Sequence, residues 1–274
     1  MNKVSQNGLL ISVIVPTYNS QGTIQAAIES VLGQSNTSFE ILVQDGVSAD
    51  RTVEICTDLA AKDSRILVHS EKDHGIYDAV NRGIARARGE WIYILGSDDR
   101  LHNNTVFEQL NAELTVSQHE IVYGNVLVSG DAGWAANGTI YDGKFDLPKL
   151  LSRNICQQAV FYQRSVFQKI GNFNTTYKVC ADWDFILRCA SQFQMKFQDV
   201  IVADFTGGAT SKQVKDVAFY NDFARNMYRY FGRKIVSSDF DNARNLIRNS
   251  VKAGFGGEGF WSKRIIRKAA GGNV

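Results

Sequence analysis

The chain has 274 residues, of which 44% are hydrophobic and 21% charged, and its formal net charge is +2. These values are ordinary for a globular protein, and the length suits one large domain or a domain with an appendage. No apolar run reaches the ~20 residues that a membrane-spanning helix needs, and residues 1–8 lack the apolar core of a signal peptide. We therefore expect a cytoplasmic protein that reaches a membrane only by binding to it. Its four cysteines form no C-x-x-C pair, so we expect them to be reduced.

The first hundred residues alternate between strand patterns and helix patterns. Continuous apolar, β-branched runs predict buried parallel strands, and apolar residues at helical spacing between them predict helices. We expect strands at residues 10–15, 39–43, 65–69 and 91–95, and helices at residues 21–32, 50–61 and 77–88. This alternation predicts an α/β fold with a mainly parallel central sheet flanked by helices.

The rest of the chain is less regular and ends in a basic segment. We expect helices at residues 104–116 and 182–191, strands near residues 121–128 and 200–205, a loop at residues 130–143, and helices from residue 212 onward. Residues 212–274 hold 13 basic and 5 acidic side chains, whereas residues 1–211 hold 17 and 23. We therefore predict one α/β domain at residues 1–211, with a nucleotide-binding half at about 10–103 and an acceptor half at about 104–211. A basic helical C-terminal extension follows at residues 212–274.

Polar residues follow three of the predicted strands. Pro16, Thr17 and Tyr18 follow the first strand, Asp45 follows the second, and Asp98-Asp99 follows the fourth. In open α/β sheets, ligands bind beyond the carboxyl ends of the strands. We therefore expect these three segments to meet at one edge of the sheet and to form a ligand site there.

Asp98 and Asp99 are adjacent carboxylates, which repel each other unless a cation lies nearby. Mg²⁺ and Mn²⁺ prefer oxygen ligands, and Mg²⁺ is typically held by one or two carboxylates together with substrate phosphates. The alternative is that the two residues only begin a turn, because aspartate is common in turns.

Several segments resemble the inverting family-2 glycosyltransferases, whose GT-A fold binds nucleotide-sugars. The order and spacing of these segments agree with the family over about residues 10–210. The segments are residues 11–19 (ISVIVPTYN), 43–52 (VQDGVSADRT), 75–83 (GIYDAVNRG), 87–90 (ARGE), 95–99 (LGSDD) and 182–188 (DWDFILR).

The resemblance implies a nucleotide-sugar donor, with a UDP-sugar as the first expectation. Pro16, Thr17 and Tyr18 are then expected to line the pocket for the base and ribose, and Asp45 to accept a hydrogen bond from the base. Tyr77 and Asp78 are expected to replace an arginine that many members carry where Val80 stands here.

The resemblance also implies a metal and a general base. Asp98 is expected to bind the Mg²⁺ or Mn²⁺ that bridges the two phosphates, and Asp99 to support that metal or the donor sugar. Asp182 is expected to be the general base, and the acceptor to be a hydroxyl of a glycan or a lipid-linked molecule in cell-surface polysaccharide synthesis.

The sequence departs from the family pattern at several positions. Gly96 stands where members often have the first aspartate of a D-x-D motif, and Ala181 stands where an acidic residue usually precedes the base. A familiar His-Gln pair is Gln157-Gln158 here. These departures leave the proposed base and the main metal carboxylate in place.

Other features of the second half allow two interpretations each. Asp184 is a competing base, but a surface charge or a partner for Arg188 at the i+4 position is favoured. Trp183 either stacks on an acceptor sugar or packs in the core. Residues 207–211, which are rich in glycine, form either a lid or an ordinary loop.

The basic tail has apolar residues such as Trp261 and Ile265 on one helical side and Lys263 and Arg264 on the other. This pattern indicates an interfacial helix on an anionic membrane surface, with docking on the acidic body or dimerisation as alternatives. No recognition motif for nucleic acid occurs. The rival functions are a non-catalytic nucleotide-sugar-binding module and a sugar nucleotidyltransferase.

Overall fold

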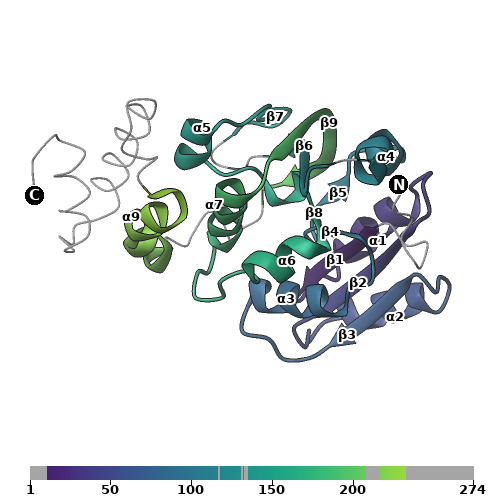
Figure 1. Ribbon diagram of the computed structural model, residues 1–274. Helices are drawn as coiled ribbons and strands as arrows, with labels where there is room; N and C mark the ends of the chain where they lie inside the picture. The colour runs from purple at the N-terminus through teal and green to yellow at the C-terminus, as the bar shows by residue number, and fades with distance from the viewer. Residues whose placement is uncertain (1–10, 117, 131, 133–134, 208–215, 233–274) are drawn as a thin grey trace, which may run out of the picture.

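In a computed structural model, the described residues 11–116, 118–130, 132, 135–207 and 216–232 form an α/β fold around one sheet of nine strands (Figure 1). The strands run in the order β3-β2-β1-β4-β8-β6-β9-β5, and β7 pairs with β6 outside this order. The strands are β1 (Ile11–Thr17), β2 (Phe39–Asp45), β3 (Ile66–Ser70), β4 (Trp91–Ile94), β5 (Arg100–Leu101), β6 (Ile121–Ser129), β7 (Ile140–Tyr141), β8 (Val160–Gln163) and β9 (Met195–Thr206).

The first four strands are parallel, as the sequence predicts. β1 lies between β2 and β4, and β2 also pairs with β3. Thr17, the last residue of β1, is the register partner of Asp45, the last residue of β2. The polar segments after these strands therefore meet at one edge of the sheet, which confirms the predicted arrangement.

Helices cover both faces of the sheet, and each face has its own hydrophobic core. One core contains buried residues of α1 (Ile24–Leu32), α2 (Thr52–Ala60) and α4 (Val106–Val116). The other contains buried residues of α3 (Ile76–Arg86), α5 (Leu147–Ser152), α6 (Arg164–Ile170), α7 (Ala181–Gln192) and α9 (Val217–Phe231).

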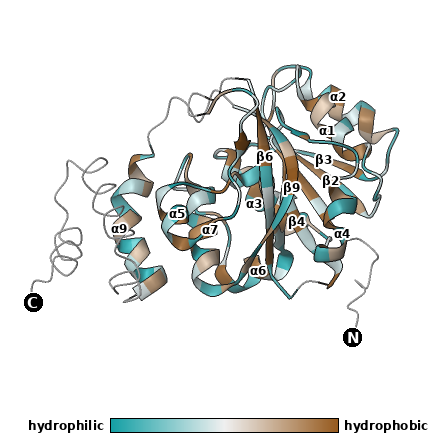
Figure 2. Ribbon diagram, turned by 90° about the horizontal axis from the view of Figure 1, so that it is seen from above, coloured by the Kyte–Doolittle hydropathy of each residue, from teal (hydrophilic) through white to brown (hydrophobic). Residues whose placement is uncertain are grey.

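The central strands supply both cores because successive side chains of a strand point to opposite faces. In β1, Val13 and Val15 belong to the core with α1, whereas Ile14 belongs to the core with α3. All three side chains are fully buried. The continuous apolar run that predicted this strand therefore reflects burial on both faces, and the hydropathy colouring shows hydrophobic strands between the helices (Figure 2).

The chain from residue 100 onward contains several short elements that the sequence does not predict. These are the two-residue strands β5 and β7, the four-residue strand β8, and helices α5 and α6. β7 lies inside the segment 130–143 that was expected to be a loop. β9 has 12 residues and begins at Met195, earlier than the predicted strand at residues 200–205.

Helix α9 lies beside α7 and packs into the same core as the sheet (Figure 1). Phe219, Phe223 and Met227 are buried there, whereas Val217 is 58% exposed. The apolar stripe on this helix therefore docks on the body of the protein. The predicted interfacial helix at residues 260–269 and all of the predicted lid except Gly207 lie outside the described residues.

Among the described helices, none combines the length and the apolar character that crossing a membrane requires.

Candidate functional site

A cavity of about 390 Å³ opens at the carboxyl ends of β1 and β4, between α3, α7, the loop 154–158 and the end of β9. Pro16, Asp98, Asp99 and Asp182 all line it, together with Tyr77. The structure thus brings residues from four of the sequence motifs, which are up to 166 positions apart, to one cavity. This volume lies in the range of ordinary small-molecule sites.

Asp99 is the more buried of the two adjacent carboxylates, with a side chain only 1% exposed. Its Oδ1 accepts a hydrogen bond from the backbone N–H of Thr206 at 2.8 Å, and its Oδ2 accepts one from Nε2 of Gln158 at 2.5 Å. Burial, and then the neighbouring Asp98, raise the pKa of Asp99 to about 7. Burial also raises the pKa of Asp98. Burial is the main cause of both shifts, and no positive charge is among the causes of either.

These two carboxylates fit a divalent cation of the Mg²⁺ or Mn²⁺ type. Their oxygens are the ligands such ions prefer, and a bound cation would favour the ionised form that burial disfavours. Among the residues that the structure describes, no third His, Cys, Asp or Glu completes a metal-binding cluster with them. A cation here would therefore need further oxygens from the phosphates of a ligand, as is common for Mg²⁺.

Gly96, which stands where the first aspartate of a D-x-D motif often occurs, has little room for a side chain. A Cβ atom at this position would lie 2.4 Å from Oδ2 of Asp99 and 3.0 Å from Oδ1 of Asp98. Cβ atoms do not approach other atoms as closely as 2.4 Å, so a side chain at position 96 would require the Asp99 carboxylate to move. The glycine at position 96 therefore leaves room for the buried carboxylate of Asp99.

Asp182 lies in the first turn of α7 on the other side of the cavity. Its carboxylate accepts hydrogen bonds from the Trp183 backbone N–H at 2.8 Å, from Asn154 Nδ2 at 2.9 Å and from the Tyr77 hydroxyl at 3.1 Å. Burial nevertheless raises the pKa of Asp182 to about 6. A carboxylate with this pKa, held in one orientation, is suited to accept a proton near neutral pH.

Tyr77 contacts Asp182 and the backbone of the same segment. Its hydroxyl lies 2.8 Å from the carbonyl oxygen of Val179 as well as 3.1 Å from Asp182, so one proton is shared between two acceptors. Asp78, which was expected beside Tyr77 in the donor site, does not line the cavity. It accepts hydrogen bonds from His74 N–H and from Arg82 instead.

The residues that were expected to contact the nucleotide base differ in their exposure to solvent. Tyr18 is 64% exposed, whereas Thr17 is buried and its hydroxyl has no hydrogen-bond partner among the described residues. Asp45 is only 2% exposed, and its Oδ2 accepts bonds from the N–H groups of Val47 and Ser48 at 3.0 Å and from the Ser70 hydroxyl at 2.6 Å. Its carboxylate therefore stabilises the turn after β2, and Tyr18 is the residue that presents an open face.

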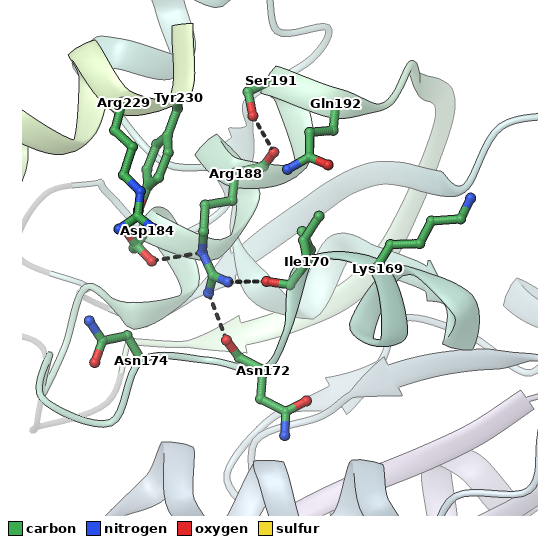
Figure 3. Close-up of a pocket in the computed structure, with 10 residues that line it drawn as sticks. All are labelled: Lys169, Ile170, Asn172, Asn174, Asp184, Arg188, Ser191, Gln192, Arg229 and Tyr230. Carbon is green, nitrogen blue, oxygen red and sulfur yellow. Dashed lines mark hydrogen bonds and ion pairs between the residues drawn. The ribbon is translucent and has the colours of Figure 1, made fainter.

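Asp184 does not line this cavity, and of its two favoured interpretations, a surface charge and a partner for Arg188, the structure bears out the second. It is 2% exposed and forms an ion pair with Arg188 at 3.0 Å, which confirms the alternative partner. Arg188 also donates to the carbonyl oxygens of Ile170 and Asn172 (Figure 3). Asp184 and Arg188 line a separate cavity of about 530 Å³ between α6, α7 and α9.

Trp183 combines the two interpretations that the sequence allows. Its ring packs 5.3 Å from that of Phe219 in α9, and its Nε1 donates to the carbonyl oxygen of Leu150 at 2.8 Å. It also lines the cavity beside Asp182. Core packing thus fixes this indole, and one part of it remains available to a ligand.

Two contacts of the cavity carboxylates are not indicated by the sequence. Asn154 bonds to Asp182, 28 positions away, and Gln158, the second residue of the pair that replaces the family's His-Gln, bonds to Asp99, 59 positions away. Lys178 also lines the cavity, and the sequence does not single it out. Single polar residues in loops carry no periodicity, so only the folded chain reveals these contacts.

Comparisons with known proteins agree on one family. The profile of "Glycosyl transferase family 2" matches residues 12–171. A "PGL/p-HBAD biosynthesis glycosyltransferase" of Mycobacterium tuberculosis is 36% identical over 219 residues, which is 77% of this chain and 82% of that protein. The "Chondroitin synthase" of Pasteurella multocida is 25% identical over 240 residues, which is 86% of this chain and 25% of that protein.

Solved structures show the same fold. The crystal structure of S. aureus TarS 1–349 in complex with UDP-GlcNAc has a TM-score of 0.72 at 17% identity and covers 96% of this chain and 80% of that one. The mannosyltransferase PcManGT from Pyrobaculum calidifontis, in complex with GDP-Man and Mn²⁺, has a TM-score of 0.57 at 16% identity, covering 95% and 79%. The GT-A fold predicted from the sequence is therefore confirmed.

Proposed function

Because the chain belongs to glycosyl transferase family 2, we propose that it transfers a sugar from a nucleoside-diphosphate donor to a hydroxyl of a glycan or lipid-linked acceptor. A UDP-sugar is the expected donor, and the transfer inverts the anomeric configuration. The relatives named "PGL/p-HBAD biosynthesis glycosyltransferase" and "Chondroitin synthase" support a role in cell-surface polysaccharide synthesis.

The observation that carries this proposal is the shared cavity of Asp98, Asp99 and Asp182. Two carboxylates with raised pKa values lie on its β4 side, and a third lies on its α7 side. Titratable groups with strongly perturbed pKa values in one cavity mark a functional site. The pair Asp98 and Asp99 and the single residue Asp182 lie on different sides of the cavity, which suits one task for the pair and another for Asp182.

The pair is assigned to the donor. Asp98 would hold Mg²⁺ or Mn²⁺ directly, and Asp99 would support it from its fixed position beside Gln158 and Thr206. Such a cation, when bound with the diphosphate, acts as a Lewis acid that stabilises the charge of the leaving group. Pro16 and Tyr18 would contact the base and ribose, with the exposed Tyr18 ring as the stacking face.

Asp182 is assigned to the acceptor as the general base. The acceptor oxygen forms a bond to the anomeric carbon while the bond from that carbon to the diphosphate oxygen breaks, and the hydroxyl proton passes to Asp182. The three hydrogen bonds from Trp183, Asn154 and Tyr77 hold its carboxylate in one orientation. Because attack and departure occur in one step, no nucleophile of the protein is required.

A screen of nucleotide-sugars by thermal shift, with and without Mn²⁺, tests the donor site. A ligand that binds only the folded state raises its stability. We expect UDP-sugars to raise the melting temperature in the presence of Mn²⁺, and GDP- and dTDP-sugars to have little effect. Release of UDP on addition of a candidate glycan acceptor then tests transfer, and NMR of the product gives its anomeric configuration.

Two results would contradict the proposal. A metal-dependent shift without turnover on any glycan or lipid-linked acceptor favours a non-catalytic binding module. Release of pyrophosphate from a nucleoside triphosphate and a sugar phosphate favours a nucleotidyltransferase. A retained anomeric configuration would reject the single displacement while leaving the transferase activity in place.

The basic C-terminal segment supports association with the cytoplasmic face of an anionic membrane, where lipid-linked acceptors would be available. A chain that ends at Gly257 lacks four basic residues of this segment and should bind less to anionic vesicles in a sedimentation assay. Equal binding of the shortened and the full chain would reject this association.

A further inference from the structure

Asp216 connects the start of α9 to the segment that leads into α7. Its side chain is only 4% exposed. Oδ2 accepts hydrogen bonds from the backbone N–H groups of Val179 at 2.8 Å and Cys180 at 2.9 Å, and Oδ1 accepts one from Phe219 N–H at 3.3 Å. Hydrogen bonds to an ionised acceptor are stronger than neutral ones. One buried carboxylate therefore joins two segments about 36 positions apart.

The segment that Asp216 holds places the proposed base. Cys180 is the N-cap residue of α7, and Asp182 follows two positions later. The carbonyl oxygen of Val179 accepts from the Tyr77 hydroxyl, which also reaches Asp182. Asp216 fixes the N–H side of this turn and Tyr77 fixes its C=O side, so the backbone before Asp182 is held from both directions.

Helix α9 has a second attachment to α7, which lies away from the cavity that contains Asp182. The Tyr230 hydroxyl donates to Oδ1 of Asp184 at 2.7 Å, and the two side chains lie together at the cavity between α7 and α9 (Figure 3). No described residue of α9 lines the cavity that contains Asp182. The described contacts between α9 and the surroundings of this cavity therefore run through α7 and the turn before it.

We propose that Asp216 is a positioning residue that orients Asp182 by fixing the backbone N–H groups of Val179 and Cys180. This inference rests on the proposed function, because it takes Asp182 as the general base. It makes α9 a part of the catalytic body, although the sequence places this helix in a separate extension. Small displacements of a catalytic group lower the rate strongly, and about 1 Å can cost on the order of 100-fold.

Two substitutions weaken or remove the contact in different ways. Asp216→Asn keeps the shape, but in either orientation of its amide the new N–H group faces a backbone N–H group, that of Phe219 or those of Val179 and Cys180. Asp216→Ser keeps a hydroxyl that can still cap α9 but is too short to reach Val179 and Cys180. Both variants are expected to lower kcat by about 10- to 100-fold. The affinity for UDP with Mn²⁺ should stay unchanged, because that site lies on the β4 side of the cavity.

A double-mutant cycle with Asp182→Asn distinguishes positioning from a general loss of structure. Turnover is followed as release of UDP from the UDP-sugar that stabilises the full chain most, with water as the acceptor where no glycan is accepted. If Asp216 acts through Asp182, Asp216→Asn should have little further effect once Asp182 is asparagine. Residues that act through one another show this non-additivity.

Phe231→Ala is the matched control, because Phe231 packs at the opposite end of α9 and is 8% exposed. It should lower the melting temperature while leaving kcat per folded molecule near that of the wild type. Wild-type kcat in either folded Asp216 variant, or an equal loss in the wild-type and Asp182→Asn backgrounds, would overturn the inference. Full turnover of Asp182→Asn itself would instead reject the proposed function.

Discussion

The two sides of the cavity hold their carboxylates by different means. On the donor side, Asp45 and Asp99 accept hydrogen bonds from residues at the ends of neighbouring strands, Ser70 of β3 and Thr206 of β9. On the acceptor side, Asp182 is held by Tyr77 and Asn154, which are 105 and 28 positions distant. The donor side is therefore built mainly into the sheet edge, whereas the acceptor side depends on the packing of several helices.

This difference has a functional consequence. Strand ends in a parallel sheet are rigid and suit a ligand bound in one constant way, such as a nucleotide. A base that several separate segments position can be adapted to different acceptors by changes in those segments. The two sides should then respond separately to substitution, with binding of the donor on one side and turnover on the other.

Asp182→Asn should give the largest effect and the clearest separation. Removing a general base lowers turnover by typically 10²- to 10⁴-fold, so we expect kcat to fall by this amount. UDP affinity in the presence of Mn²⁺, measured by calorimetry, should not change. Asp58→Asn, an exposed aspartate of α2, is the control and should retain both properties. A loss of UDP binding in Asp182→Asn would break the separation between the two sides.

Asp98→Asn should show the opposite behaviour. Because it removes the proposed direct metal ligand, we expect the affinity for Mn²⁺ to fall by roughly 10- to 100-fold, as for other changes at metal sites. The UDP-dependent rise in melting temperature should then require far more Mn²⁺. A full rise in melting temperature at the Mn²⁺ concentration that the wild type needs would reject Asp98 as the metal ligand.

The pH dependence of the wild type sharpens the comparison further. Asp182 accepts a proton only when it is ionised, so kcat should fall as the pH drops through its pKa of about 6 and lose about tenfold for each further unit. Asp99, whose pKa is about 7, titrates nearby, so the profile is measured at saturating Mn²⁺, which would keep that carboxylate ionised. A kcat that stays constant from pH 8 to pH 5 would reject Asp182 as the base.

The comparison also explains what the sequence can predict. Strands β1, β2 and β4 were predicted because each is a run of residues buried on both faces, and β3 was predicted from a shorter apolar run in which only Ile66 is buried. The meeting of Pro16, Asp45 and Asp98 followed from the parallel arrangement alone. In contrast, β5 and β7 have only two residues each, and such short elements form because neighbouring strands are already in place, not because of a local pattern.

The contacts of the acceptor side were not predictable for a related reason. Asp182 was identified from a family motif, but its spacing does not indicate Asn154, Tyr77 or Asp216 as partners. These residues meet through helix packing over long sequence distances, which a single sequence does not reveal. The burial of Asp184 was missed because an i+4 partner is equally compatible with an exposed ion pair.

The smallest expected effect concerns stability on the donor side, in buffer with a chelator. Asp99 has a pKa of about 7 in the folded protein, above its ordinary value of 3.8. Between these values the folded state binds a proton that the unfolded state has released, so this group lowers stability as the pH rises, and the loss is complete above about pH 7. Asp99→Asn removes this loss, while the Gln158 amide can turn to face the new N–H group. We therefore expect a higher melting temperature than the wild type at pH 8, with a gain of 2 to 4 °C for roughly each kcal/mol, and no gain at pH 4.

Asp63→Asn is the control of opposite sign, because hydrogen bonds from Arg65 hold the pKa of Asp63 below its usual value, and this variant should melt earlier at pH 8. If Asp99→Asn also melts earlier at pH 8, the Asp99 carboxylate stabilises the metal-free fold, and the raised pKa no longer explains why this corner of the cavity should attract a cation.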